Sequence, residues 1–191
     1  IARGAGDAPA RVPEVRELAL ALRGLTAAGH GPGFGEHGDE AVVCLEALRE
    51  ALRADAKARN SWAADGRDRT VLEQVLDGDD RTMVLAALAE VAALRGGDLA
   101  RTMQAELTAL CGDVLGGPKT PVPGVLHSST STASLGEAGR LFAMAPALGV
   151  DPELASKARS AAGVWLAQEA DLGRRSGPGA LAAMLYGFAD L

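Results

Sequence analysis

The sequence predicts an all-α fold, and three observations support this class. Apolar residues recur at a spacing close to 3.6 along most of the chain. Glycine-rich breaks separate these periodic segments, as expected where helices end. Hydrophobic residues make up 48% of the chain but aromatic residues only 3%, so Leu, Ala and Val must fill the core. Such side chains suit helices that pack closely on helices.

Two amphipathic helices are expected in the first 55 residues. Pro13 stands where a first helix would begin, and Gly29 stands where it would end. Asp39 and Glu40 precede the apolar residues of the second helix, where negative charge favours a helix N-terminus. The stripes consist of Val15, Leu18, Leu22 and Leu25, followed by Val42, Leu45, Leu48 and Leu52.

Three further helices are predicted in the middle of the chain, over residues 69–77, 80–95 and 98–115. Asp77-Gly78 is taken as the end of the first, and the other two close on Gly-Gly. Their apolar faces are expected to include Leu72, Val75 and Leu76, then Leu85, Leu88 and Ala92, then Met103, Leu107, Leu110 and Val114.

Residues 116–134 contain three prolines and a Ser/Thr run without periodicity, which predicts a linker or an exposed loop. Beyond it, helices are expected over 135–149, 152–171 and 178–190. The chain is thus divided into a helical repeat region (1–115), this linker (116–134) and a C-terminal helical segment (135–191). The last segment is expected to pack on the repeats or to cap them.

The repeat is suggested by a shift of 40 residues, which aligns residues 39–52 with 79–92. Identical residues then coincide at Asp39/Asp79, Leu45/Leu85, Ala47/Ala87, Leu48/Leu88 and Glu50/Glu90. The order of helix, Ala-Ala-Asp-Gly corner at 63–66 and helix resembles an armadillo repeat, or the related HEAT repeat. Gly66 matches the glycine at which armadillo repeats bend. The resemblance covers mainly residues 39–115, and it implies a short α-solenoid; an irregular helical bundle is the alternative arrangement.

The armadillo resemblance implies a surface that binds another protein or a peptide. The W-x-x-x-N pattern with which nuclear-import receptors hold basic peptides has no counterpart in residues 69–76. This absence places recognition of basic localisation peptides in doubt. Stability would require neighbouring repeats, because one repeat cannot bury its apolar stripe alone.

Charge and composition exclude several classes of ligand. The net charge is −6 and arginine is scattered among acidic residues, so direct nucleic-acid binding is not expected. No apolar run has the length of a membrane span, which predicts a soluble protein. Cys44 and Cys111 lack C-x-x-C spacing and are interpreted as core residues in a reducing, intracellular compartment. Because the first residue is Ile1, removal of an upstream targeting segment is a hypothesis.

The most unusual stretch is GPGFGEHGD at residues 31–39, which contains a G-x-G-x-x-G pattern. A dinucleotide site needs a strand before this pattern, and the preceding residues predict a helix instead. A metal site is the alternative, because His30, Glu36, His37 and Asp39 are ligand types close in sequence. Their spacing matches no defined motif, so an interhelical loop is preferred. No cofactor is predicted.

No catalytic motif was found, and no catalytic residue is assigned. His127 has no evident nucleophile or metal partner, and the paired carboxylates Asp79-Asp80 stand where a helix start needs a capping or solvent-facing acid. Trp62 lies outside every apolar stripe, either packed beneath the corner or exposed as a partner-binding residue. The sequence therefore predicts a non-catalytic interaction or scaffold module, such as a subunit of a larger assembly. An α-helical enzyme or metal-binding domain using residues 30–39 is the alternative.

Overall fold

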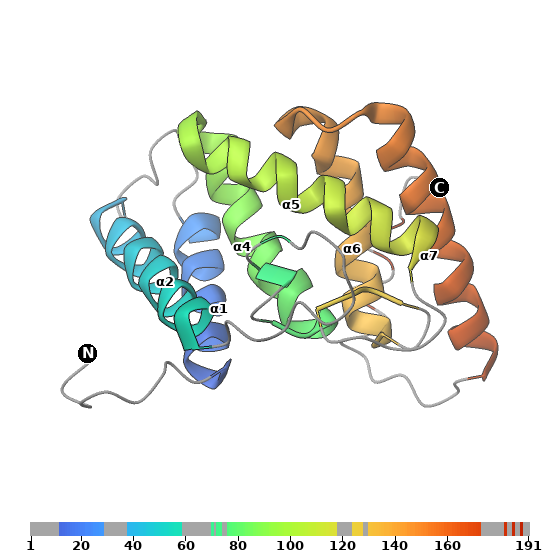
Figure 1. Cartoon of the computed structure of the whole chain (residues 1–191), viewed down its shortest axis with the longest axis horizontal. Coiled ribbons are helices and arrows are strands. Elements are labelled where there is room, and N and C mark those ends of the chain that lie inside the picture. Colours follow the sequence, from blue (N-terminus) through green and yellow to red (C-terminus); the bar gives the residue numbers. More distant parts are fainter. Residues whose placement is uncertain are drawn as a thin grey trace.

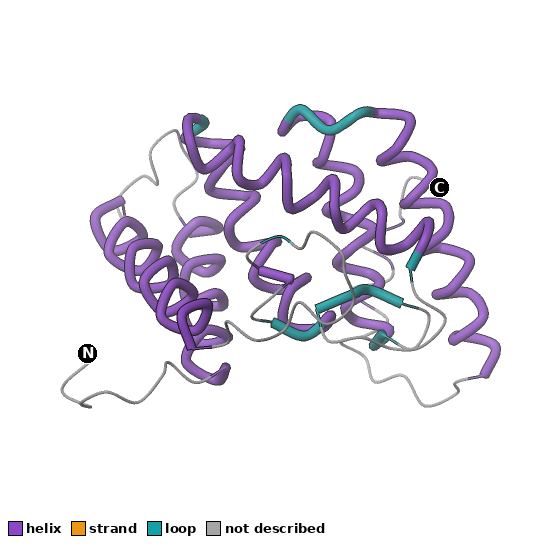
Figure 2. The backbone as a smooth tube through the Cα atoms, in the orientation of Figure 1, coloured by secondary structure: helices purple, strands orange, loops and turns teal. Residues whose placement is uncertain are grey.

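The all-α class is confirmed by the computed structural model. The structure describes residues 12–28, 38–58, 70, 72–73, 76–117, 124–127, 130–172, 182, 185 and 188. Within these residues there are six α helices and one short 3-10 helix, and none of them lies in a strand. Figure 1 shows the helices in their order along the chain, and Figure 2 shows that helix accounts for nearly all of the described backbone.

The helices agree closely with the predicted segments. They are α1 (Val12–Ala28), α2 (Gly38–Ala58), α4 (Gly78–Arg95), α5 (Gly97–Gly116), α6 (Thr132–Met144), η2 (Ala145–Leu148) and α7 (Pro152–Leu172). The helix expected over 135–149 begins earlier and tightens into η2 at Pro146. Of the helix expected over 69–77, Leu72 and Glu73 are helical, whereas Thr70, Leu76 and Asp77 are not. Of the helix expected over 178–190, the described residues 182, 185 and 188 are helical.

Helix α4 is the centre of the packing. It contacts α1, α5 and α6, while α2 packs on α1 and α7 packs on α5 and α6 (Figure 1). Most of α4 is enclosed because Ala86, Ala87, Ala89 and Ala92 are small enough to admit neighbours on several sides. The hydrophobic core joins residues of all six helices. The armadillo-like repeat stays a prediction.

Most residues of the predicted apolar faces are buried where the structure describes them, whereas Leu18, Leu25 and Val42 are half-buried. Leu45, Leu48, Leu85 and Leu88 are all at most 3% exposed. The four predicted residues of α5 are Met103, Leu107, Leu110 and Val114, and they are buried as well. The helical spacing of apolar residues thus identified the core correctly.

Two predictions about acidic residues were wrong. Asp77 does not end a helix: its carboxylate accepts a hydrogen bond from the Asp80 amide at 2.8 Å and caps the start of α4. Asp80 is not a solvent-facing acid, because it is only 3% exposed and forms an ion pair with Arg16 of α1. Burial raises the pKa of the Asp80 carboxyl, as does the nearby Asp77 charge, whereas Arg16 opposes the rise.

Part of the region expected to be a linker belongs to the core. Val125 and Leu126 are fully buried. Gly124 has a φ of +81°, and a Cβ at this position would lie 1.9 Å from the Glu73 carbonyl oxygen. A glycine is therefore required here, because it alone permits this approach of backbone to backbone.

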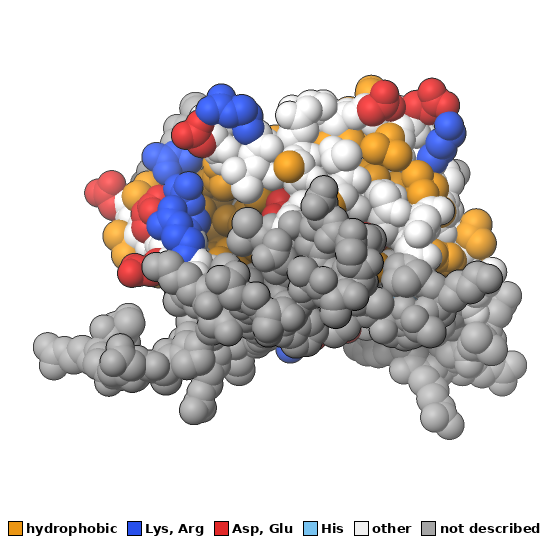
Figure 3. Space-filling model, in the orientation of Figure 1, with side chains coloured by type: hydrophobic (Ala, Val, Ile, Leu, Met, Phe, Trp, Pro, Cys, Tyr) orange, Lys and Arg blue, Asp and Glu red, His pale blue; other side chains and the backbone are white. Residues whose placement is uncertain are grey.

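The face in Figure 3 carries acidic, basic and apolar side chains side by side among its described residues. No helix in the part of the chain that the structure describes is both long enough and apolar enough to cross a bilayer.

Candidate partner-binding groove

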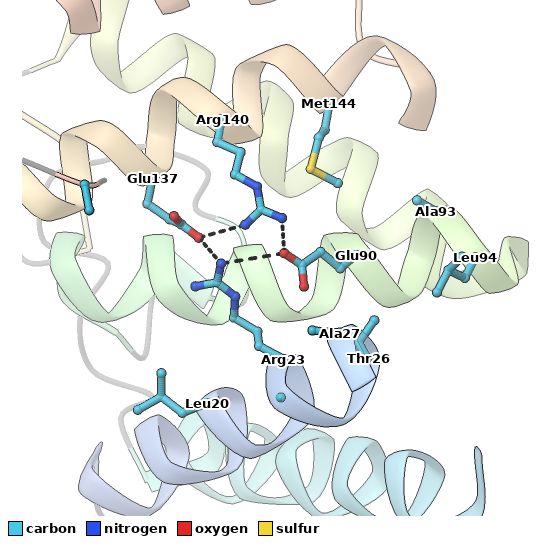
Figure 4. A pocket seen from close by; sticks show the side chains of 12 residues that line it. Leu20, Arg23, Thr26, Ala27, Glu90, Ala93, Leu94, Glu137, Arg140 and Met144 are labelled. Atoms are coloured by element: carbon cyan, nitrogen blue, oxygen red, sulfur yellow. Dashed lines mark hydrogen bonds and ion pairs between the residues drawn. The ribbon is translucent and has the colours of Figure 1, made fainter. Parts of the chain in front are cut away.

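A groove of about 790 Å³ lies where α1 and α6 pack on α4, and it is open to solvent (Figure 4). Arg23 reaches from α1 toward α6 across α4 in this view. The residues that line the groove are Leu20, Arg23, Gly24, Thr26, Ala27, Glu90, Ala93, Leu94, Glu137, Arg140, Met144 and Ala182.

Each helix contributes one face to the groove at helical spacing. On α1 the positions i, i+3, i+4 and i+7 are Leu20, Arg23, Gly24 and Ala27. The lining residues of the other two helices are also three or four positions apart. On α4 they are Glu90, Ala93 and Leu94, and on α6 they are Glu137, Arg140 and Met144. Three helix faces thus meet at a surface that none of the described helices covers.

Four charged side chains form a closed set of ion pairs across the groove. Arg23 Nη2 lies 2.9 Å from Glu137 Oε1 and 3.6 Å from Glu90 Oε1. Arg140 Nη1 lies 3.5 Å from Glu137 Oε1, and Arg140 Nη2 donates to Glu90 Oε1. Each arginine therefore contacts both glutamates, and the four formal charges cancel.

This ion-pair square links the three helices that form the groove. Arg23 comes from α1, Glu90 from α4, and Glu137 and Arg140 from α6 (Figure 4). All four side chains are partly shielded from solvent. A network of this kind fixes the spacing of the helices more firmly than isolated surface pairs would. It also provides a polar floor in an otherwise apolar groove.

The edges of the groove are apolar and exposed. Leu20 is 56% exposed and Leu94 is 47% exposed, although both are large hydrophobic side chains. Ala27, Ala93 and Met144 continue the apolar surface between them. Apolar side chains gathered around a concave surface are typical of a binding site.

Gly24 leaves unused space in the wall of the groove. No heavy atom lies within 4 Å of the position that a Cβ would occupy there. A glycine inside a helix costs about 0.5–1 kcal/mol relative to alanine. No contact within the described protein accounts for this cost, because the space beside Gly24 is empty.

A smaller hollow of about 330 Å³ adjoins the groove and shares Arg23 and Glu137 with it. Its other lining residues include Arg16, Asp79 and Ser131. The Ser131 amide donates to Asp79 Oδ1 at 3.1 Å, which ties the start of α6 to the start of α4. This hollow has both polar and apolar lining residues, and its hydrogen bonds and ion pairs join elements of the fold to one another.

The predicted metal ligands do not define this site. His30, Glu36, His37 and also Trp62 lie outside the described residues. Asp39 lies exposed in the first turn of α2. Within the part of the chain that the structure covers, no three His, Cys, Asp or Glu side chains are grouped closely enough to hold a metal ion.

His127, Cys44 and Cys111 do not line the groove. His127 receives a hydrogen bond at its carbonyl from the Thr130 amide at 2.9 Å. Cys111 is buried and burial raises the pKa of its thiol to about 11, which keeps it protonated at neutral pH. Cys44 is half-buried, donates to the Leu18 carbonyl and also has a raised thiol pKa because of burial. Both cysteines are free.

Sequence reasoning missed the groove because it followed a single apolar stripe per helix. In residues 12–28 a second face, with Leu20, Gly24 and Ala27, runs beside the stripe that enters the core. Glu137 and Arg140 show an i, i+3 charge pairing that was also readable. Their meeting with Arg23 and Glu90 depends on tertiary packing, which the spacing within one helix cannot show.

Comparison of the chain with protein-family models, with curated proteins and with solved structures gives no match. The function of the groove is therefore argued from its geometry and charge.

Proposed function

We propose that the protein is a non-catalytic interaction module, and that its groove binds an α-helix of another protein. The observation that carries this proposal is the empty space beside Gly24, in the wall of a groove with exposed apolar edges. A scaffold or subunit role in a larger assembly is consistent with such a site.

A helix is the occupant that the shape favours. The groove is bordered by two helices that both pack on α4, so an added helix would extend the existing layer. Packed helix axes lie about 8–10 Å apart, and small residues at the contact allow the closer distances. Gly24, Ala27 and Ala93 are such residues. A partner helix with apolar side chains at i, i+3, i+4 and i+7 would contact Leu20 and Leu94.

The ion-pair square adds a requirement on the partner. Arg23 makes both of its ion contacts through Nη2, which leaves Nε and Nη1 without a partner among the described residues. A docked helix would displace water from these donors, and buried donors without acceptors are costly. We therefore expect one Asp, Glu, Asn or Gln within the partner's apolar stripe, opposite Arg23.

The test begins by identifying the partner and then measures its affinity. A photo-reactive amino acid at Leu20 is crosslinked in the source cells, with Val43 as a control position because it is 70% exposed on α2, outside the groove lining. A protein captured only from position 20 is then purified. Its dissociation constant is measured by calorimetry against the unmodified protein and two variants.

The two variants are Gly24→Leu and Gly112→Leu. Both glycines are helical, and neither has a heavy atom within 4 Å of the position that a Cβ would occupy, so both substitutions should preserve or increase stability. We expect Gly24→Leu to weaken binding at least about tenfold, because the new side chain occupies the space required by the partner. Gly112→Leu should bind normally. Equal affinity of all three proteins would overturn the proposal.

Two further measurements would show whether the groove holds a second copy of the chain or a small molecule instead of a partner helix. Sedimentation equilibrium would show a dimer if a second copy of the chain filled the groove, and Gly24→Leu would dissociate it. Native mass spectrometry would show a bound small molecule, lost in Gly24→Leu and kept in Gly112→Leu. Either result would replace a partner helix as the ligand.

A further inference from the structure

Helices α1 and α4 run in the same direction beside the groove. Arg16, near the start of α1, forms an ion pair with Asp80, near the start of α4. About two turns further along α1, Arg23 lies 3.6 Å from Glu90 in the second half of α4. The two ion pairs follow the same order along both helices, so α1 and α4 lie parallel to each other.

Helix α6 runs in this direction as well. The Ser131 amide at its start donates to Asp79 at the start of α4, whereas Arg140 in its second half contacts Glu90. All three helices of the groove therefore begin at the hollow of about 330 Å³ and end at the apolar part of the groove, beside Leu94. Acidic residues in the first turns of α1 and α4 offset the positive ends of their dipoles, but α6 has none there.

Hydrogen-bond donors are left over at the end where the helices begin. Arg16 lines the hollow, and its side chain is 52% exposed. It contacts Asp80 through Nε, so Nη1 and Nη2 have no partner among the described residues. Arg23 follows seven residues later on the same helix, with its own unused Nε and Nη1. About 10 Å along the helix axis separates the two arginines.

We propose that the partner helix binds antiparallel to α1, α4 and α6, with its last turn in the hollow against Arg16. This inference rests on the proposed function. The last four carbonyl groups of a helix have no donor within the helix, and they carry the negative end of its dipole. Arg16 supplies donors for these carbonyl groups. The first turn of a helix would instead bring N–H groups to the same place and leave the Arg16 donors unused.

The acidic side chains of the hollow already have donors. Asp79 accepts from the Ser131 amide at 3.1 Å, and Glu137 pairs with Arg23 at 2.9 Å. The N–H groups of a reversed helix would have to compete with these contacts, and their positive dipole end would face the positive charge of Arg16. The hollow therefore favours the last turn of the partner helix over its first turn.

The spacing of the two arginines predicts a pattern in the partner. The polar residue expected opposite Arg23 should lie about seven residues before the end of the partner helix, because Arg16 is about two turns away. The residues before that polar residue should be apolar, since Leu94 and Met144 line the groove beyond Arg23.

A library of helical peptides supplies a probe that does not depend on the natural partner. The peptides have Leu at i, i+3, i+4 and i+7 and random residues elsewhere. This pattern reads the same in both directions, so it does not bias the orientation. The library is selected on the unmodified protein and depleted on Gly24→Leu, which leaves peptides that need the open space in the groove.

The orientation is then measured with a nitroxide label at either end of a selected peptide. Met83 lines the hollow and Met144 lines the groove near the end of α6, and their methyl resonances are broadened by a label nearby. We expect the C-terminal label to broaden Met83 more than Met144, and the N-terminal label to do the reverse. The opposite result, or equal broadening, would overturn the orientation and leave the helix-binding function standing. If no peptide depends on Gly24, the proposed function fails and the orientation with it.

A variant of Arg16 tests the contact with the last turn. Arg16→Lys keeps a cation for Asp80 but lacks the two Nη donors, so it should weaken binding of the selected peptide about fivefold. Removal of the last turn of the peptide should abolish this difference. The control is Arg49→Lys, because Arg49 pairs with Glu46 on α2 and lines neither the groove nor the hollow. Equal affinity of the unmodified protein and Arg16→Lys would contradict the proposed position of the helix end.

Discussion

Arg81 of α4 and Asp113 of α5 form an ion pair inside the protein, where their side chains are 0% and 3% exposed. The same Arg81 Nη1 donates to the Gly124 carbonyl at 2.8 Å, and Nη2 lies 3.9 Å from Glu106 Oε2. Glu106 in turn accepts from the Leu72 amide at 3.1 Å and from the Thr70 hydroxyl. One arginine thus joins α4, α5 and two connecting segments.

Removal of Arg81 should therefore be costly. Arg81→Ala would remove the arginine that pairs with the buried Asp113 carboxylate, and breaking a buried pair from one side costs about 3–5 kcal/mol. Urea denaturation of Arg81→Ala should show a loss of this size in the free energy of unfolding. The control is Arg101→Ala, because Arg101 pairs with Asp98 at a largely exposed position and should change stability by less than about 0.5 kcal/mol. Similar losses at both positions would contradict the buried network.

Glu106 should make stability depend on pH. Burial raises the pKa of its carboxyl above the usual 4.5, although Thr70, Leu72 and Arg81 oppose the rise. As pH increases through 4.5, the unfolded state releases this proton while the folded state retains it, so the unfolded state gains stability. The contribution of Glu106 to folding should therefore fall as pH increases from about 4 to 7.

The Glu106→Gln variant isolates this contribution, because its amide does not titrate and other groups cancel in the comparison. Free energies of unfolding are measured by urea denaturation in steps across that pH range. The stability of the unmodified protein minus that of Glu106→Gln should decrease with pH and level off above the folded pKa. A difference that stays constant or increases would show that the pKa of Glu106 is not raised.

Gly124 should tolerate no side chain. Its φ of +81° is unfavourable for other residues, and a Cβ would lie 1.9 Å from the Glu73 carbonyl oxygen. Gly124→Ala should destabilise the protein by more than about 2 kcal/mol, because the backbone must move and the bond from Arg81 to the Gly124 carbonyl is disturbed. Gly112→Ala, in an open helical position, should instead be neutral or stabilising in the same thermal denaturation measurement.

The sequence predicted the helices well and the polar interior poorly, for a physical reason. Apolar spacing within one helix reports which face is buried, so the core positions Leu48, Leu88 and Leu107 were identified. Arg81 follows two aspartates at a helix start and has the sequence context of a solvated charge. Its burial is decided by Asp113 and Gly124, which are 32 and 43 residues away in the chain.

The groove was hidden for the same reason. Leu20 and Leu94 are single apolar residues on otherwise mixed helix faces, and only the packing of α1 on α4 brings them to one surface. Glycine gave an ambiguous signal, since Gly24, Gly124 and Gly139 look alike in sequence. In the structure, Gly24 lies beside open space and Gly124 lies against the Glu73 backbone, whereas Gly139 contacts the Phe188 ring.

The ion-pair square should contribute to stability in a way that salt weakens. Glu90 contacts both Arg23 and Arg140, so Glu90→Gln would leave two arginines near a single glutamate, Glu137. We expect a loss of about 1 kcal/mol in the free energy of unfolding at low ionic strength, more than an exposed pair gives. In about 1 M salt the loss should shrink without disappearing, because partly buried pairs are screened less than exposed ones.

The matched control for this measurement is Glu46→Gln, since Glu46 pairs only with Arg49 among the described residues, one turn away on α2 and in an exposed position. Its effect should stay below about 0.5 kcal/mol and vanish in high salt. Because the square also sets the distance between α1 and α6, Glu90→Gln should shift the methyl resonance of Met144 in the groove, whereas Glu46→Gln should not. Equal stability losses together with an unmoved Met144 resonance would mean that the four charges act as ordinary surface pairs, and that apolar packing on α4 alone holds the groove open.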